Sequence, residues 1–255
     1  MGDLLFGIHP VCEALIARRR RVHNVYIAKH RKGKGLERLL ALAERQNVSV
    51  QCMGSGFFHA KLGDVVHQGV AAEVGDLPIV DQGTLLAVTQ TGGAAPLVLA
   101  LDGIVDPQNL GSIIRSARAM GVDAMVLPKV RCAPLSPATS KASAGAMEHM
   151  RFARVPNMVS ALGAFKQYGC WVVGTAARTR LAVYDADLTV PLVLVVGGEE
   201  KGLRPLVRKT CDFLVSIPQL GEVDSLNAAV AGAIVMYEVM RQRRAKQAEG
   251  EQERK

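Results

Sequence analysis

The fold of this chain is decided by the stretch Leu99-Ala-Leu-Asp-Gly-Ile-Val-Asp-Pro-Gln-Asn-Leu-Gly-Ser-Ile-Ile-Arg-Ser-Ala-Arg-Ala-Met-Gly121. It opens as an apolar run, breaks at Asp106-Pro107 and continues with the apolar spacing of a helix. We expect that helix to begin near Asn109, whose side chain can accept hydrogen bonds from amides of the first turn. α/β proteins place their chemistry where a strand leads through a polar loop into a helix, although a turn without function has the same pattern.

Two later stretches repeat this form. The first is Val193-Leu-Val-Val-Gly-Gly-Glu-Glu-Lys-Gly-Leu203, an apolar strand that leads into glycine and glutamate residues. The second is Leu214-Val-Ser-Ile-Pro-Gln-Leu-Gly-Glu-Val-Asp-Ser-Leu-Asn-Ala-Ala-Val-Ala231, in which we expect a helix to begin near Ser225 to Asn227. The chain therefore has three places at which polar side chains follow an apolar strand.

From residue 94 onward, apolar strands alternate with helical stretches. The strands are predicted at residues 97–101, 124–127, 171–174, 192–196 and 213–217, and the helices at 111–120, 136–147, 159–168, 203–210 and 225–244. The strands do not alternate polar with apolar residues, which indicates an α/β domain with a parallel sheet covered by helices on both faces. The sequence has neither the Gly-x-Gly-x-x-Gly dinucleotide fingerprint nor the phosphate-binding loop of nucleotide hydrolases.

Residues 1–75 are predicted to form a separate small α/β unit. Its helices are expected from Gly7 to Ile16 and from Gly35 to Gln46, and its strands at 25–27, 48–50 and 70–74. Residues 76–93 have the glycine and proline content of a flexible linker. They connect the unit to residues 94–255 either as a hinge or as a fixed surface segment, and the sequence favours neither.

Positive charge is concentrated at the two ends of the chain. Residues 1–75 contain 11 lysine or arginine residues against 6 aspartate or glutamate residues, residues 76–240 contain 14 of each kind, and residues 241–255 contain 6 against 3. The run Arg18, Arg19, Arg20 and Arg21, joined by Lys29, Arg31, Lys32 and Lys34, is either a solvated surface or a phosphate-binding patch. Aromatic residues make up only 4% of the chain, so stacking of nucleic-acid bases on aromatic rings is not expected.

The cysteines show no metal-binding or disulfide pattern. Cys12, Cys52, Cys132, Cys170 and Cys211 are scattered and odd in number, and no histidine lies at metal-ligand spacing. We expect most of these thiols to be small core residues of a protein in a reducing cytoplasm, without a metal site. We see no apolar run of roughly 18 residues that could cross a membrane, and no signal peptide.

Together, the three strand-to-helix stretches resemble the SpoU (TrmH) family of RNA ribose 2′-O-methyltransferases. The first family motif matches Asp106, Pro107, Asn109, Gly111 and Arg115, the second Gly198, Glu199, Gly202 and Leu203, and the third Ile217, Pro218, Ser225, Leu226 and Asn227. Any one of these motifs alone is a weak signal, whereas three of them in family order are specific.

The resemblance extends to the start of the chain. Gly7, His9, Pro10 and Val11 are similar to the opening of the family's RlmB-like branch, whose N-terminal domain is similar to ribosomal protein L30e and holds substrate RNA. The family implies a C-terminal trefoil knot in the parallel-sheet domain, although general rules of chain topology argue against a knot. It also implies S-adenosyl-L-methionine as the cofactor and a homodimer.

The resemblance also implies the catalytic residues. Arg115 is the expected catalytic group, and because arginine is too basic to accept a proton, we expect it to act by its charge on an RNA phosphate or on the hydroxyl. Its expected place in the first turn of a helix opposes the helix dipole, which favours a functional role over a structural one. Asn109, Glu199, Ser225 and Asn227 complete the set, and Glu199 is expected either to pair with Arg115 or to cap a helix.

The cofactor is expected to lie against a second set of residues: Thr175, Gly197, Gly198, Ile217 and Leu226. Glycine lets the backbone approach an adenosine closely, and the two apolar residues would enclose the adenine. The expected function is therefore 2′-O-methylation of a guanosine in large-subunit ribosomal RNA. Two alternatives stay open: a tRNA 2′-O-methyltransferase, and a non-catalytic RNA-binding factor of ribosome assembly.

Overall fold

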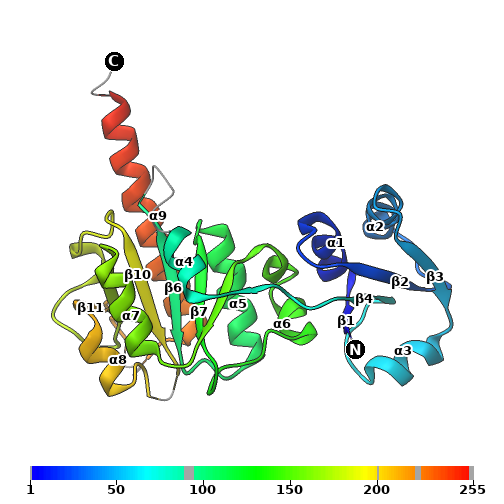
Figure 1. The fold of residues 1–255 in the computed structure, drawn as a ribbon, viewed down its shortest axis with the longest axis horizontal. Helices are drawn as coiled ribbons and strands as arrows, with labels where there is room; N and C mark the ends of the chain where they lie inside the picture. The colour runs from blue at the N-terminus through cyan, green and yellow to red at the C-terminus, as the bar shows by residue number, and fades with distance from the viewer. Residues whose placement is uncertain (1, 89–94, 200, 222–224, 253–255) are drawn as a thin grey trace. The chain divides into compact units, whose positions relative to one another are not determined.

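The structure, a computed structural model, describes residues 2–88, 95–199, 201–221 and 225–252. The chain divides into two compact units, and Figure 1 labels most of their helices and strands. The first unit contains Met1–Pro78 and Pro134–His149, and the second contains Ile79–Ala133 and Met150–Lys255. The predicted α/β class is confirmed, but the first unit includes a segment that the sequence analysis placed in the second domain.

A four-stranded sheet forms the first unit. Its strands are β1 (Asp3–Phe6), β2 (Val22–Ala28), β3 (Ser49–Met53) and β4 (Val70–Val74), in the order β1-β4-β2-β3. β2 and β3 are parallel, and the other pairs are antiparallel. Helices α1 (Ile8–Ala17), α2 (Lys34–Arg45) and α3 (Ser55–Leu62) lie between the strands along the chain. The apolar face of α2 buries Leu36, Leu39 and Ala43 in the core of this unit.

The sequence analysis missed two elements of this unit. β1 is a four-residue strand, and its pairing partner is β4, about seventy residues further along the chain (Asp3 opposite Val74). α3 lacks a continuous apolar face, and its buried residue is Phe58, whose ring stacks on His67 at 4.8 Å. Both elements are stabilised by partners that a local apolar period does not reveal.

The segment Pro134–His149 folds as part of the first unit. It contains α6 (Pro137–Ala142) and the 3-10 helix η1 (Ala146–His149). The Arg20 side chain, 1% exposed, donates from Nε to Glu148 Oε2 (2.8 Å) and from Nη2 to Glu148 Oε1 (2.6 Å). Ser140 Oγ donates to the same carboxylate at 2.9 Å. A buried, two-pronged ion pair therefore fastens this segment to the turn between α1 and β2.

A seven-stranded parallel sheet forms the second unit. Its strands are β5 (Ile79–Val80), β6 (Leu97–Asp102), β7 (Ala124–Pro128), β8 (Phe152–Val155), β9 (Trp171–Thr175), β10 (Leu192–Gly197) and β11 (Phe213–Val215), in the order β11-β9-β10-β6-β7-β8-β5. The predicted parallel sheet is confirmed. The chain leaves β6 to form β7 on one side of it and later returns to form β10 on the other side, so the strand order reverses at β6. In parallel α/β sheets, ligands bind outside the carboxyl ends of the strands at such a reversal.

Helices cover both faces of this sheet (Figure 1). Apolar residues of α4 (Gln82–Val88), α7 (Met158–Gln167) and α8 (Pro205–Thr210) pack in one layer against Val193 and Val195 of β10. The other layer contains α5 (Pro107–Ala119) and α9 (Ala228–Gln252), which pack against each other. Val196 of β10 faces Gly232 of α9, as alternation along a strand requires. A short 3-10 helix, η2 (Val183–Asp185), follows β9.

The structure differs from the predicted linker over residues 79–88. β5 pairs with β8, with Ile79 opposite Phe152. Leu85 and Leu86 of α4 are buried in the core of the second unit. Burial of these leucines holds the segment on the sheet despite its glycine and proline neighbours. Residues 89–93 of the predicted linker lie outside the described residues.

The cysteines are free thiols in this structure. Burial raises the pKa of Cys132 and of Cys211 to about 11, so both thiols are neutral at pH 7 and are poor nucleophiles. In the described part of the chain, no helix has both the length and the apolar character that a membrane span requires.

Candidate active site

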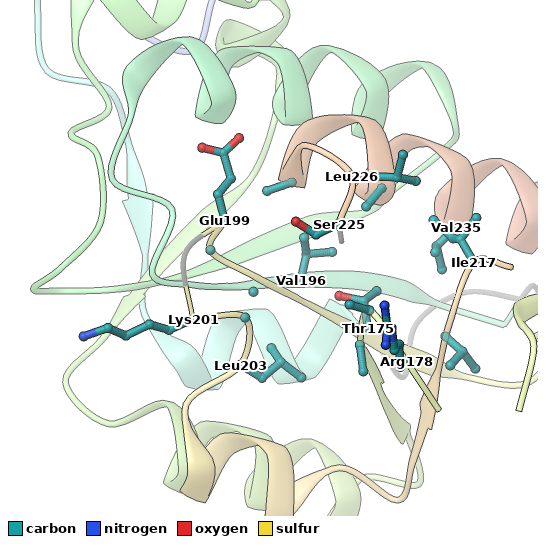
Figure 2. A pocket seen from close by; sticks show the side chains of 18 of the residues that line it. Thr175, Arg178, Val196, Glu199, Lys201, Leu203, Ile217, Ser225, Leu226 and Val235 are labelled. Atoms are coloured by element: carbon teal, nitrogen blue, oxygen red, sulfur yellow. The ribbon is translucent and has the colours of Figure 1, made fainter. Parts of the chain in front are cut away.

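A pocket of about 460 Å³ lies at the carboxyl ends of β9, β10 and β11 (Figure 2). Its lining comes from residues 175–178 after β9, 196–199 and 201–203 at the end of β10, 215–219 around the end of β11, and 225–235 around the start of α9. Because the strands are parallel, their carboxyl ends bring these distant segments to one edge of the sheet.

The residues predicted to hold a cofactor all line this pocket: Thr175, Gly197, Gly198, Ile217 and Leu226. Glu199 and Ser225, from the predicted catalytic set, line it as well. Further apolar lining comes from Val196, Leu203 and Val235 (Figure 2). A concave site of this volume with apolar walls and a few polar groups suits a nucleoside-sized ligand.

Gly197 and Gly198 are required by the packing of the chain itself. A Cβ on Gly197 would lie 2.3 Å from the carbonyl carbon of Gly202, and a Cβ on Gly198 would lie 2.4 Å from the carbonyl oxygen of Gly103. The loop turns back on itself, with Gly202 N donating to Gly198 O at 2.9 Å. The sequence analysis assigned these glycines to the approach of an adenosine, whereas here they permit the approach of neighbouring backbone.

Asp102 holds this loop in place, and the sequence analysis did not single it out. It ends β6 with 1% exposure, and its carboxylate accepts from Arg204 N (2.8 Å) and Arg204 Nε (2.6 Å). A buried carboxylate needs such charge-assisted partners. The signal that could have found it is a single charged residue at the end of an otherwise apolar strand.

Asn227 connects all three family motifs. Its Nδ2 donates to Oδ1 of Asn109 at 3.0 Å and to the carboxylate of Glu199. Its Oδ1 accepts from Ala229 N (2.9 Å) and Val230 N (3.2 Å), so the same side chain caps α9. The cap fixes the orientation of the amide, because the oxygen faces the helix and only the NH₂ group can face Asn109 and Glu199.

Asn227→Asp is expected to keep the helix cap and to abolish this network. Aspartate caps a helix as well as asparagine does, but it places a carboxylate oxygen against the oxygens of Asn109 and Glu199. We expect the methyl transfer that the resemblance implies to fall about 10²-fold through misplacement of the loops. Circular-dichroism melts and transfer of tritiated methyl groups measure the two effects.

Asn227→Ala is the control for this prediction, because it loses the cap and the donor together and should also lower the melting temperature. An Asn227→Asp chain that is as active as the unchanged protein would show that the amide donor has no part in the site.

Helix α5 begins earlier than predicted. Its N-cap is Asp106, whose carboxylate accepts from Gln108 N (3.2 Å) and Asn109 N (3.1 Å), and Pro107 occupies the first helical position. Proline at the first helical position after an aspartate N-cap is a strong signal for the start of a helix. The sequence analysis placed the start later because the apolar spacing of the helix becomes clear only further along the chain. Asn109 therefore lies inside the first turn, and its side chain contacts Asn227 instead of capping the helix.

Arg115 is exposed in the third turn of α5. Its expected position in the first turn is therefore corrected, and the argument from an unfavourable helix dipole no longer applies. Among the described residues, no hydrogen bond or ion pair connects Arg115 with Glu199, whose carboxylate accepts from Asn227. Arg115 is also not among the described residues that line the pocket.

The basic residues predicted as one patch form two groups in the first unit. Arg18, Arg19 and Arg21 precede β2, whereas the group that we call the lysine group, Lys29, Arg31, Lys32 and Lys34, follows it. β2 has 7 residues, so the two groups lie about 20 Å apart. Arg20 is buried against Glu148, and its guanidinium is not available to a ligand.

Two family models match the chain. Residues 96–237 match the SpoU rRNA Methylase family. The chain belongs to this family. Residues 4–79 match a second model, described as RNA 2′-O ribose methyltransferase substrate binding, and most of the first unit lies within this match.

Curated relatives of this SpoU family chain match it over nearly its full length. The 23S rRNA (guanosine-2′-O-)-methyltransferase RlmB of Pseudomonas putida is 39% identical over 96% of this chain and 98% of its own length. The enzyme of the same name from Coxiella burnetii is 36% identical over 94% of this chain and 96% of its own length.

Solved structures of SpoU family members share the fold. The SpoU methyltransferase AviRb from Streptomyces viridochromogenes, in complex with the cofactor AdoMet, superposes with a TM-score of 0.79 and 27% identity, over 95% of this chain and 90% of its own. The A. aeolicus TrmH/SpoU tRNA modifying enzyme has a TM-score of 0.55 and 27% identity, over 65% of this chain and 86% of its own.

Proposed function

We propose that this chain transfers a methyl group from S-adenosyl-L-methionine to the 2′-oxygen of a guanosine in 23S ribosomal RNA. The observation that carries the proposal is the hydrogen-bonded network of Asn109, Glu199 and Asn227, which joins three family motifs beside the pocket. The chain is a SpoU family member, and relatives that match it over nearly their whole length are 23S rRNA guanosine-2′-O-methyltransferases.

The pocket residues fit an adenosyl cofactor. Ile217, Leu226 and Val235 supply apolar walls for an adenine, and the loop backbone after β9, β10 and β11 supplies polar groups that can recognise its edge. When bound, S-adenosyl-L-methionine supplies an electrophilic methyl group on its positively charged sulfur.

The remaining task of the protein is to make a 2′-hydroxyl reactive. The oxygen must lie in line with the methyl group, and as the new carbon–oxygen bond forms and the carbon–sulfur bond breaks, the proton of the hydroxyl must pass to an acceptor such as a solvent water. We assign Arg115 to the electrostatic part of this step: its guanidinium binds an RNA phosphate or lowers the pKa of the hydroxyl. Asn109, Glu199 and Asn227 position the loops, and Ser225 contributes a hydroxyl at the pocket wall.

Ribosomal RNA is favoured over tRNA by the extent of the matches. The P. putida 23S rRNA enzyme matches 96% of this chain, including the first unit, whereas the A. aeolicus tRNA modifying enzyme matches 65%. The substrate-binding family model matches residues 4–79, which include most of the first unit. We propose that the lysine group of this unit contacts RNA phosphates. These four side chains are exposed and follow one strand closely.

We also propose that the chain forms a homodimer through α9. Val230, Ile234 and Tyr237 are 48%, 38% and 51% exposed, and their spacing places them on one stripe of the helix. An exposed apolar stripe of this kind is typical of a protein interface.

Ile234→Glu is expected to convert a dimer into a monomer, because it places a charge in the centre of that stripe. Light scattering should then give the chain mass of 27.3 kDa instead of twice that value. Glu238→Gln, one turn further along α9, is the matched control. A monomeric unchanged chain, or a dimeric Ile234→Glu chain, would contradict the proposed interface.

Two further expectations stay proposals. A C-terminal trefoil knot is supported by the pocket, which collects the loops after β9 and β10 and the start of α9 at one edge of the sheet. A cytoplasmic location is supported by the free cysteines, since a reducing compartment keeps thiols unpaired.

The test is methyl transfer from tritiated S-adenosyl-L-methionine into protein-free 23S RNA, 16S RNA and tRNA, followed by mapping of the labelled nucleotide. Label at a ribose oxygen of a guanosine in 23S RNA is the expected result. Label in tRNA alone would reassign the substrate. RNA binding without any label, including in precursor ribosomal particles, would favour the non-catalytic assembly factor.

A further inference from the structure

The first unit has a hollow of about 680 Å³ where the chain enters β2. We call it the arginine hollow; its lining includes Arg18, Arg19, Arg20, Arg21 and His23 from one side and Arg45 and Asn47 from the other. Five of its ten described lining residues are arginine, and none of the ten is aspartate or glutamate. The walls therefore gather positive charge that no carboxylate in the lining offsets.

The backbone beneath these arginines is held by specific contacts. Arg18 has a left-handed φ of 51°, and its N donates to Ala14 O at 3.2 Å, which ends α1. Gln46 Nε2 donates to the carbonyl oxygen of Leu15, which ties the end of α2 to the end of α1. Arg20 is fixed to Glu148. A cluster on such a fixed frame loses less conformational entropy on binding than one on a free loop.

Helix capping accounts for only part of this charge. A cation complements the dipole at the carboxyl end of a helix, and both Arg18, the C-cap of α1, and Arg45, in the last turn of α2, have that position. Glu148 neutralises Arg20. Arg18 and Arg21 remain exposed beside Arg45. Their repulsion is unfavourable in the free protein and is relieved by an anion in the hollow.

The arginine hollow and the lysine group lie at opposite ends of the same elements. Arg21 precedes β2 and Lys29 follows it, while Lys34 begins α2 and Arg45 ends it. A 7-residue strand and a 12-residue helix both give a separation of about 20 Å. One phosphate cannot reach both clusters, whereas a polymer with regularly spaced phosphates can.

We propose that the arginine hollow is a second phosphate-binding site, which acts together with the lysine group on one RNA molecule. The RNA bound by the first unit then spans at least about 20 Å, which calls for a folded or double-stranded element and not an isolated short loop. The inference rests on the proposed function in taking RNA as the ligand.

The test compares two RNA hairpins on the full chain by fluorescence anisotropy, without S-adenosyl-L-methionine. One hairpin has a stem of about 20 base pairs, longer than the roughly 16 that a double-stranded RNA-binding domain spans, and the other a stem of about 4. The hollow variant carries Arg18→Gln, Arg21→Gln and Arg45→Gln. A matched variant carries Arg31→Gln, Lys32→Gln and Lys34→Gln, and the charge control carries Arg241→Gln, Arg244→Gln and Lys246→Gln on α9.

With the long hairpin, the hollow variant and the matched variant should each bind at least about tenfold more weakly at 0.15 M salt, and the slope of log K against log salt should become shallower by about 2. With the short hairpin, each should lose no more than about twofold, because the remaining cluster still holds it. The charge control should bind both hairpins as the unchanged chain does.

Three outcomes would overturn the proposal: a hollow variant that keeps its affinity for the long hairpin, equal losses with both hairpins, or an equal loss in the charge control. Circular dichroism checks that each variant is folded. Because binding is measured without methyl transfer, a chain that binds as expected but methylates no RNA would refute the proposed function and leave this inference standing.

Discussion

Arg115→Ala is expected to slow methyl transfer about 10³-fold, the effect of removing a charged group that stabilises a transition state. Arg115 does not line the pocket among the described residues, so the affinity for S-adenosyl-L-methionine should stay within about twofold. Single-turnover transfer of tritiated methyl groups gives the rate, and calorimetry with the cofactor gives the affinity. The combination of a lost rate and an unchanged cofactor affinity separates a catalytic role from a role in building the pocket.

Arg118→Ala is the matched control for this prediction. Arg118 is also exposed on α5, in its last turn, where it complements the helix dipole. We expect this variant to transfer methyl groups at nearly the original rate. Equal losses in the two variants would show a general effect of charge on RNA binding, and an Arg115→Ala chain with more than a tenth of the original rate would remove Arg115 from the mechanism.

Arg115→Lys separates two mechanisms for the same group. Lysine keeps the charge but lacks the planar, two-pronged donor set of a guanidinium. Recovery of most of the rate would indicate that charge near the hydroxyl suffices. A rate as low as that of Arg115→Ala would indicate paired hydrogen bonds to an RNA phosphate.

Arg20→Ala should destabilise the first unit by about 3–5 kcal/mol, because it leaves the carboxylate of Glu148 buried without its counter-ion. Both side chains are 1% exposed, and the remaining side-chain donor to Glu148 among the described residues is Ser140 Oγ. Urea unfolding measures the change. Trp171, the only tryptophan, lies in β9 of the second unit, so its fluorescence reports that unit. Far-UV circular dichroism follows both units, so an unfolding transition seen by circular dichroism but not by fluorescence belongs to the first unit.

Two variants make this prediction specific. Arg20→Met combined with Glu148→Leu should recover most of the lost stability, since a buried ion pair is often replaced by apolar residues at little cost. Arg18→Ala, two residues away and exposed, should change the free energy of unfolding by no more than about 0.5 kcal/mol. If Arg20→Ala costs less than Arg18→Ala, the ion pair does not hold the segment 134–149 in the first unit.

The local pattern of the sequence determined the class of the fold and most of its elements. Apolar runs without alternation predicted β6, β7, β9 and β10 to within a residue or two of their observed bounds, because strands covered on both faces must be apolar throughout. The resemblance to the SpoU family named the residues of the site, and those expected to hold the cofactor all line one pocket. The parallel sheet explains this result, since loops at the same strand ends meet wherever they lie along the chain.

Only the tertiary structure decided which partners these residues have. Asp102 and Arg204 lie 102 residues apart and Asn109 and Asn227 lie 118 apart, and the local periodicity of the sequence does not reveal such pairs. The glycines of the second motif are required by neighbouring backbone, which is visible only once the loop is folded. The basic run of the first unit divides into two distant groups because β2 and α2 separate them, and Arg20 is withdrawn from the surface by Glu148 from a different part of the chain. Chemistry of the side chains is a local property that can be read along the sequence, whereas burial and pairing depend on contacts that form only when the chain closes on itself.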